Sequence, residues 1–270
     1  MAAQESQAGG LLVTAALEFS QVTLGYPGRT VLEDIEFSVR AGEVFAVVGP
    51  NGVGKSTLIR AASGILPPER GKIAIQGQDI VRMSPARRAR RVAVVPQAIH
   101  LPPAVRAMEV VLMGRTPYLG WLEREDELDR QLAADAMRRT ETYELAHRRV
   151  GELSGGEQQR LLVARAVAQS ASVLLLDEPT AHLDLRHQDR TLKLVRDLAH
   201  EQGLGVLIAL HDLNLVARFS DRVALLSDGR IKSIGDPRQV LTPLELGAAY
   251  GVEIHVVEDP IHGTPLVLTG

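Results

Sequence analysis

The residues with the clearest chemical potential form a glycine-rich stretch between the apolar run Val44–Val48 and a segment with helical periodicity. Glycines let the backbone wrap closely, so that several N–H groups point at the same phosphate oxygens, and the following helix adds the positive end of its dipole. Lys55 is placed to reach the β and γ phosphates of a nucleotide, and the Ser56 hydroxyl to ligate Mg²⁺. The predicted phosphate loop consists of Gly49, Pro50, Asn51, Gly52, Val53, Gly54, Lys55, Ser56 and Thr57.

Two adjacent carboxylates, Asp177 and Glu178, follow the apolar run Val173–Leu176. A buried strand there would deliver both to its C-terminal end, which is the usual ligand-facing edge of an open α/β sheet. We expect Asp177 to hold Mg²⁺, directly or through water. Glu178 is aimed differently and is a candidate general base for an attacking water. Kinases, GTPases and helicases share these two features, so they predict nucleotide chemistry without identifying a family.

A second glycine motif, Leu-Ser-Gly-Gly-Glu-Gln-Gln-Arg over Leu153–Arg160, separates those classes. Two glycines at the start of a helix expose backbone donors and a helix dipole to an anion. Because Gly49–Thr57 already supplies one phosphate cradle, a second makes physical sense if it closes over the nucleotide of a neighbouring copy. The residues of this expected trans-acting loop are Leu153, Ser154, Gly155, Gly156 and Glu157.

Apolar runs alternate with helical patterns along most of the chain, which predicts a mostly parallel α/β sheet. From about residue 98 to 151 the pattern is mostly helical, with helices expected over Ala104–Met113 and Leu128–Leu145 around a turn at Pro117–Gly120. The other expected helices are Ser56–Ser63, Gly155–Gln169, Arg186–Gln202 and Asn214–Ser220. The expected strands are Ala16–Val22, Ile35–Val39, Val44–Val48, Lys72–Ile75, Val92–Val95, Val173–Leu176, Val206–Leu210 and Val223–Leu226.

Composition excludes several classes of protein. The 270 residues are 45% hydrophobic and 23% charged, which fits a globular chain with a substantial core. Without cysteine, disulfides and thiolate metal sites are excluded. No apolar run approaches the roughly 20 residues of a membrane span, and the polar start predicts a disordered tail over 1–15 rather than a signal peptide. The net charge of −3 argues against a nucleic-acid partner, and the basic run Arg82–Arg91, which lacks aromatics, is expected to form a solvated helix face.

With these three motifs in this order, the chain resembles the nucleotide-binding subunits of ABC transporters over nearly its whole length. The resemblance implies a RecA-like P-loop NTPase core with a mostly parallel sheet, an N-terminal antiparallel β region and a helical subdomain insert. It implies a nucleotide-binding domain over 16–249 and a short C-terminal extension over 250–270. Within that domain the core covers 16–97 and 155–249, and the helical subdomain covers 98–154. ATP and Mg²⁺ are the implied ligands, and a second copy of the chain is the implied partner.

The resemblance also implies roles outside the three motifs. Tyr26 matches the aromatic that stacks on adenine. Gln97 matches the glutamine that touches Mg²⁺ and the attacking water, and it hinges the helical insert to the core. His211 matches the switch histidine that contacts the γ-phosphate. The loop that passes along the dimer seam, the D-loop, corresponds to Ala181, His182, Leu183 and Asp184.

Two softer segments suggest which transporters are involved. Met113–Gly120 and Val257–Val267 look like the corresponding parts of the ATPases for iron–siderophore, haem and cobalamin uptake. One nucleotide-binding domain without a membrane span also resembles importers, which usually keep these parts on separate chains. We therefore expect an ABC-type ATPase that energises import of a chelated metal compound through integral membrane permease subunits. The resemblance places it peripherally on the cytoplasmic face of the inner membrane, with an extracytoplasmic substrate-binding protein as an indirect partner.

Three alternatives remain. A soluble ABC ATPase of translation usually carries two nucleotide-binding domains in one chain, and this chain has one. A DNA-repair or chromosome-organising ATPase needs a long coiled-coil insertion, for which the helical stretch 98–151 leaves no room. A P-loop kinase with a small-molecule acceptor would not need the motif Leu153–Arg160.

Overall fold

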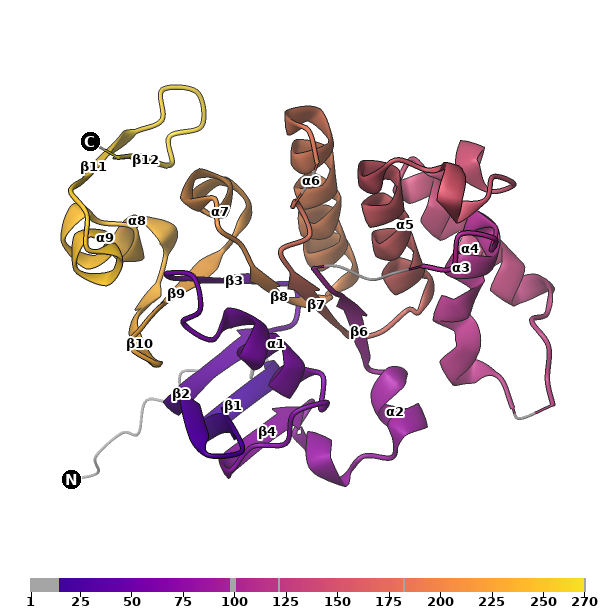
Figure 1. Ribbon diagram of the computed structural model, residues 1–270, viewed down its shortest axis with the longest axis horizontal. Helices are drawn as coiled ribbons and strands as arrows, with labels where there is room; N and C mark the ends of the chain where they lie inside the picture. Colours follow the sequence, from indigo (N-terminus) through magenta and orange to yellow (C-terminus); the bar gives the residue numbers. More distant parts are fainter. Residues whose placement is uncertain (1–14, 98–100, 121, 182, 270) are drawn as a thin grey trace, which may run out of the picture.

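A six-stranded sheet runs through the middle of the structure (Figure 1). The computed structural model describes residues 15–97, 101–120, 122–181 and 183–269, so the predicted tail 1–15 lies outside the described residues except for Ala15. Strand β10 is antiparallel to its neighbour and the other five strands are parallel, which confirms the predicted fold class. In spatial order the strands are β10 (Arg230–Gly235), β9 (Arg222–Ser227), β3 (Val44–Val48), β8 (Gly205–Ala209), β7 (Val173–Asp177) and β6 (Val92–Val95).

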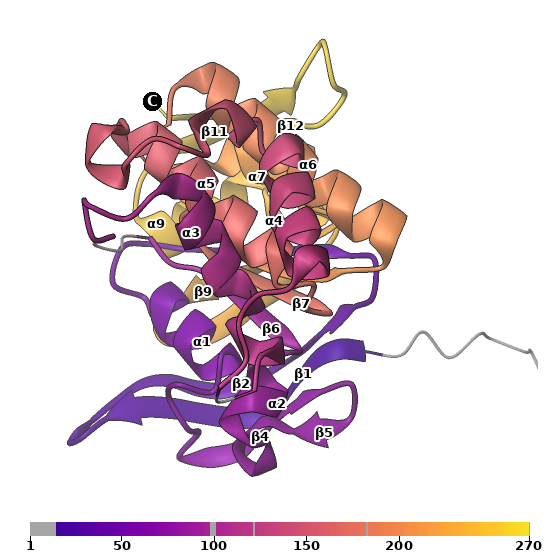
Figure 2. The ribbon, with the colours of Figure 1, turned by 90° about the vertical axis from the view of Figure 1, so that its right-hand side faces the viewer.

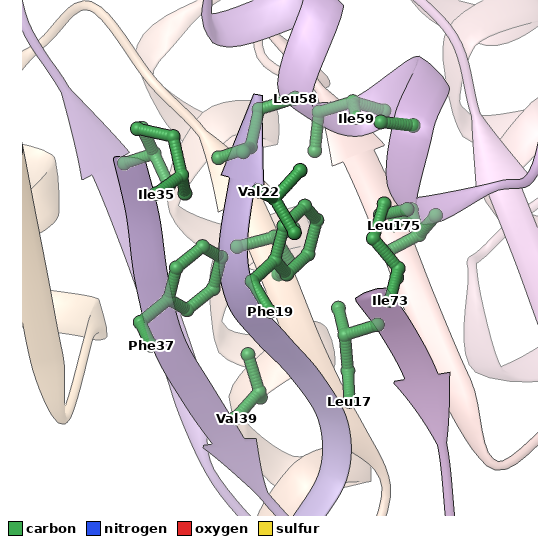
Figure 3. Close-up of a cluster of buried hydrophobic side chains, with 14 of the residues drawn as sticks. Leu17, Phe19, Val22, Ile35, Phe37, Val39, Leu58, Ile59, Ile73 and Leu175 are labelled. Atoms are coloured by element: carbon green, nitrogen blue, oxygen red, sulfur yellow. The ribbon is translucent and has the colours of Figure 1, made fainter. Parts of the chain in front are cut away.

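The N-terminal region forms a separate antiparallel sheet, as predicted, and helix α1 (Lys55–Ala62) lies between it and the central sheet (Figure 1). Figure 3 shows the apolar interior that joins these layers, with Phe19 and Phe37 from the antiparallel sheet beside Leu58 and Ile59 of α1. The rings of Phe19 and Phe37 stack with their centroids 4.6 Å apart. The phosphate loop therefore leads into a helix held from both sides. This sheet consists, in order, of β2 (Arg29–Arg40), β1 (Ala15–Tyr26), β4 (Arg70–Ile75) and β5 (Gln78–Asp79).

The opposite face of the central sheet is covered by α5 (Gly155–Ala168), α6 (Leu185–Gln202) and α7 (Leu213–Phe219) (Figure 1). Along β3, Phe45 points toward α1 and the antiparallel sheet, and Ala46 points toward the helices. Central strands buried on both faces explain why the sequence shows continuous apolar runs there instead of alternation.

The helical insert differs from its predicted form in where its helices end. Three helices, α3 (Ala107–Leu112), α4 (Glu127–Arg139) and α5, pack around one small apolar cluster. The predicted single helix Leu128–Leu145 is wrong, because α4 stops at Arg139 and a separate 3₁₀ turn follows. The Thr140 hydroxyl donates to the Ala136 carbonyl (3.0 Å), a side-chain bond that competes with helix continuation, and Glu141 has a positive φ of 54°.

The segment Met113–Gly120 fastens the far end of α5. A turn was predicted over Pro117–Gly120, but residues Met113–Tyr118 form a 3₁₀ helix instead. Within it the Arg115 guanidinium is buried, donating from Nε to Asp129 Oδ1 (2.9 Å) and from Nη1 to the carbonyl of Ala168 (2.9 Å), the last residue of α5. The hydrogen bond from Arg115 lowers the pKa of Asp129. These contacts of Arg115 hold the segment Met113–Tyr118 against α4 and α5 and stabilise the insert.

The remaining elements lie around the edge of the core (Figures 1 and 2). The predicted helix over the basic run Arg82–Arg91 is the short α2 (Pro85–Ala89), with Arg87 exposed. Near the C-terminus, a hairpin that the sequence analysis did not predict follows α9. Among the described residues, no helix is both long and apolar enough to cross a bilayer. The other elements here are 3₁₀ turns at Ile80–Arg82 and Val150–Glu152, α8 (Pro237–Val240), α9 (Pro243–Tyr250), β11 (Ile254–Glu258) and β12 (Pro265–Thr269).

Replacement of Arg115 by methionine tests whether its contacts stabilise the fold. The variant leaves the buried Asp129 carboxylate without its cationic partner, so we expect it to lower the free energy of unfolding by about 3 kcal/mol. Urea denaturation measures this change. Arg82→Ala is the matched control, since the Arg82 side chain is 87% exposed and its pairing with Asp79 contributes little. Equal stabilities for the two variants would contradict a structural role for Arg115.

Candidate functional site

The phosphate loop connects β3 to α1, and its shape depends on two glycines. Gly49 has a φ of +147°, and a Cβ there would lie 2.2 Å from the carbonyl oxygen of Leu226. Gly54 precedes α1 with a φ of +117°, and a Cβ there would meet Leu32 at 2.7 Å. Neither position accepts a side chain, so the backbone passes close to its neighbours and its N–H groups remain available to a ligand.

Lys55, the first residue of α1, is nearly fully buried with its ammonium inside the loop. Its Nζ donates to the carbonyls of Gly49 (2.7 Å) and Pro50 (3.1 Å). Burial lowers the pKa of Lys55, while the negative charges of Glu178 and Asp177 act in the opposite direction. The cation is therefore oriented across the loop before any anion arrives.

The side chains of Ser56 and Asp177 meet beside this loop. The Ser56 hydroxyl donates to Asp177 Oδ1 at 3.1 Å. Burial raises the pKa of Asp177, and this hydrogen bond acts against the shift. A hydroxyl and a carboxylate next to a phosphate loop fit Mg²⁺, which is usually held by one or two carboxylates together with substrate phosphates. Among the described residues no cluster of three His, Cys, Asp or Glu side chains offers a metal site of its own.

Three residues expected to act in catalysis come together at Glu178. Gln97 Nε2 donates to Glu178 Oε2 at 2.6 Å, and His211 Nε2 forms an ion-pair contact with Glu178 Oε1. The three residues follow β6, β7 and β8, which are adjacent parallel strands, so their C-terminal ends lie at one edge. The Glu178 side chain is 11% exposed, whereas that of His211 is 46% exposed. The arrangement presents a base and two polar neighbours at the edge that the phosphate loop also occupies.

The backbone holds Glu178 in an unusual conformation. Its φ is +51°, in the left-handed region that few residues other than glycine occupy. Its N–H donates to the carbonyl of Ala209 at the end of β8 (3.0 Å), so the neighbouring strand fixes the turn. The two adjacent carboxylates have different partners, since Asp177 accepts from Ser56 and Glu178 accepts from Gln97.

The second glycine motif caps α5. The Ser154 hydroxyl accepts from the N–H of Glu157 (3.3 Å), and Glu157 Oε2 accepts from the Ser154 N–H (2.7 Å). That backbone hydrogen bond lowers the pKa of Glu157. A Cβ on Gly155 would meet nothing within 4 Å, so this end of the helix is open, while Leu153 is buried beneath it. Since α5 and α1 cover opposite faces of the central sheet, the structure does not bring the two glycine motifs of one chain together.

Tyr26 and the D-loop occupy the periphery of the site. Tyr26 ends β1, is 38% exposed, and its hydroxyl accepts from Arg60 of α1 (3.0 Å). Its predicted stacking on adenine remains a prediction. In the D-loop Leu183 is buried and Asp184 caps α6, accepting from the N–H of His187 (2.9 Å). His182 lies outside the described residues.

One residue near the phosphate loop was missed by the sequence analysis. Tyr250, at the end of α9, is partly buried and packs against the apolar cluster that contains Val48 at the end of β3. Burial raises the pKa of Tyr250, and the backbone of Gly49 acts in the opposite direction. No local pattern marks this tyrosine, because its neighbour is some two hundred positions earlier in the chain.

Comparisons with known proteins agree with these features. The family model described as ABC transporter matches residues 32–181. The hemin import ATP-binding protein of Thermobifida fusca is 42% identical over 256 residues, covering 94% of this chain and 89% of that protein. The cobalamin import ATP-binding protein of Halobacterium salinarum is 43% identical over 251 residues, or 93% of this chain, and the chain spans only 63% of its length.

A solved structure, assigned to a metal-chelate type ABC transporter in an inward-facing conformation, has a TM-score of 0.82 and 30% identity. The match covers 94% of this chain and 96% of that one. The family model covers more than half of the chain, and the Thermobifida relative matches nearly all of it. The chain belongs to the ABC transporter family.

Proposed function

We propose that this chain is the ATP-hydrolysing subunit of an importer for a chelated metal compound. The observation that carries the hydrolytic part is the convergence of Gln97, Glu178 and His211 at the sheet edge that holds the phosphate loop. The printed names of the relatives, hemin import and cobalamin import, support the importer part, and an iron–siderophore belongs to the same cargo class. The structural similarity to the solved metal-chelate type transporter also supports the importer part.

The hydrolytic chemistry follows from the positions of the side chains. Backbone N–H groups of Gly49–Thr57, the N-terminus of α1 and the Lys55 ammonium bind the β and γ phosphates of ATP. Glu178 accepts a proton from the attacking water as that water forms its bond to the γ-phosphorus. The bond from the γ-phosphorus to the bridging oxygen breaks at the same time, and ADP leaves with that oxygen. Gln97 orients this water, and His211 contacts the γ-phosphate and Glu178. Tyr26 stacks on the adenine through its half-exposed ring.

Ser56 and Asp177, with Gln97 nearby, would hold Mg²⁺ when it is bound, and the ion would neutralise charge developing on the phosphate oxygens. The chain's own contribution is the pair of oxygen ligands that the structure brings to 3.1 Å. Burial of Asp177, which raises its pKa, makes a bound cation the natural partner of its ionised form.

The second half of each ATP site comes from another copy of the chain. The open N-terminus of α5, with Gly155 unobstructed, is suited to an anion, and its own phosphate loop lies across the central sheet. In a symmetric dimer, Leu153–Glu157 of each protomer covers ATP held by its partner, and Ala181–Asp184 passes along the seam. ATP then favours the closed dimer because the γ-phosphate contacts both halves, and hydrolysis releases it.

Such a subunit works peripherally at the cytoplasmic face of the inner membrane, bound to integral permease subunits and indirectly served by an extracytoplasmic substrate-binding protein. A soluble ABC ATPase of translation or DNA repair is the alternative. The two named import relatives favour the transporter.

Replacing Glu178 by glutamine should slow ATP hydrolysis at least about 100-fold, because a positioned general base contributes on that order. Equilibrium ATP binding should be retained, since the phosphate loop is intact. Phosphate release and nucleotide titration measure the two quantities. Glu36→Gln, on an exposed position of β2, is the matched control and should behave like the parent. An unchanged turnover rate for Glu178→Gln would remove Glu178 from its role.

Mixing two inactive variants tests whether the sites are shared between copies. Lys55→Ala removes the cation of the phosphate loop, and Gly155→Asp places a carboxylate at the open end of α5 without a clash inside the protomer. A mixed dimer keeps one site with both halves intact, so the mixture should hydrolyse ATP faster than either variant alone. Half of randomly formed dimers are mixed and each has one good site of two, so recovery should reach at most about a quarter of the parent rate. A mixture no faster than its parents would argue that each chain works alone.

Co-purification from the native membrane separates the importer from the soluble alternative. We expect the tagged chain to be recovered with an integral membrane protein. The substrate-binding protein of that system should hold a compound with iron, cobalt or a haem-like chromophore, detected by elemental analysis and absorbance. Recovery of ribosomes or DNA-processing proteins in place of a membrane partner would favour the alternative.

A further inference from the structure

The C-terminal hairpin is joined to the helix that begins two residues after His211. Figures 1 and 2 show β12 beside α7. The joint is the side chain of Asn214, in the first turn of α7. Its Oδ1 accepts from the N–H of Val267 (2.7 Å), and its Nδ2 donates to the carbonyl of the same residue (3.3 Å). An amide side chain that pairs with both groups of one backbone residue is a directional contact and not general surface packing.

The register of the hairpin leaves these two groups free for Asn214. Val267 lies opposite Val256, and the N–H of Asp259 bonds the carbonyl of Thr264 at the hairpin's turn (2.8 Å). Hydrogen-bonded and non-hydrogen-bonded pairs alternate along an antiparallel ladder, so the count from Asp259 makes Val256–Val267 a non-hydrogen-bonded pair. The N–H and C=O of Val267 therefore point outward, toward α7. Asn214 takes the place that a third strand would occupy.

Further hydrogen bonds connect Asn214 to the segment that carries His211. Asp212 caps α7, accepting from the N–H groups of Asn214 (2.8 Å) and Leu215 (3.1 Å). The backbone of Asn214 is thus tied to the residue directly after His211, while its side chain is tied to β12. Movement of the hairpin cannot occur without moving this short segment or breaking these bonds.

Apolar contacts seat the hairpin on the same region. Val256 and Val267 pack against the apolar cluster that contains Val216 of α7, and so does Tyr250. The C-terminal segment therefore packs against the helix that follows His211.

We propose that Asn214 is a positioning residue for hydrolysis, which clamps the His211 segment to the C-terminal hairpin so that the imidazole stays in contact with Glu178. This inference rests on the proposed function, since it concerns the same hydrolytic site. Asn214 itself touches neither ATP nor the reacting atoms. Its role gives the C-terminal residues 250–269 a purpose in the ATPase.

Two substitutions break the clamp from opposite sides. Asn214→Ala removes the amide side chain. Val267→Pro removes the backbone N–H that donates to Asn214, at an edge position where proline is tolerated. For the full-length protein with Mg²⁺ and ATP, we expect each variant to lower kcat about tenfold, which corresponds to ~1.4 kcal/mol, with KM for ATP within about twofold of the parent. The double variant should be no slower than Asn214→Ala alone, because that substitution already removes both hydrogen bonds to Val267.

Controls separate positioning from general damage. His255→Ala changes an exposed side chain on the same hairpin and should leave kcat unchanged. Thermal unfolding should show that the clamp variants remain folded at the assay temperature. A purely structural role predicts a lower unfolding temperature with kcat unchanged for the folded fraction, and that result would overturn the proposal, as would additive losses in the double variant.

A His211→Ala reference distinguishes failure of this inference from failure of the proposed function. If His211→Ala is inactive while Asn214→Ala hydrolyses ATP like the parent, the clamp is wrong and the ATPase assignment stands. If His211→Ala hydrolyses ATP at the parent rate, the histidine has no part in hydrolysis and both statements about it fall.

Discussion

The carboxylate of Glu178 is the constraint around which the site is organised. A carboxylate this far from water needs donors, and leaving it unpaired would be strongly destabilising. Gln97 and His211 supply them, each from the end of a neighbouring strand. The contact therefore requires β6, β7 and β8 to be parallel and in the observed register, with Val95 opposite Leu176 and Asp177 opposite Ala209. The side-chain contacts of Glu178 and the topology of the sheet therefore depend on each other.

The conformation of the phosphate loop likewise depends on the layers around it. Gly49 passes against the backbone of Leu226 in β9, and Gly54 passes against Leu32 in β2. The loop can take its shape only if both sheets are already in place. The apolar interior of Figure 3 supplies that condition, because Leu58 and Ile59 of α1 are buried among residues of the antiparallel sheet. Binding geometry here depends on packing between layers that are distant in the sequence.

Sequence analysis predicted the features that depend on local patterns of residue types. Continuous apolar runs identified β3, β6, β7 and β8, and fixed glycine spacings identified the loop before α1 and the start of α5. The features it missed depend on particular side-chain contacts that an apolar pattern does not encode. The end of α4 at Arg139 is set by hydroxyl bonds of Thr140, and the burial of Arg115 is set by Asp129 and the end of α5. The hairpin β11–β12 pairs locally and was simply missed, whereas its docking on α7 through Asn214 joins positions some fifty residues apart.

Helix α5 shows how the parts combine. Leu162 and Ala166 pack into the cluster beneath the central sheet's helices, while Leu161 and Ala164 pack into the cluster of the helical insert. Its N-terminal end carries the open Gly155, and its C-terminal end is held by Arg115. A helix that belongs to two apolar clusters and is fastened at its far end joins the insert firmly to the central sheet. The end of α5 that carries Ser154 therefore cannot shift relative to the insert without disturbing the cluster that holds Leu161 and Ala164.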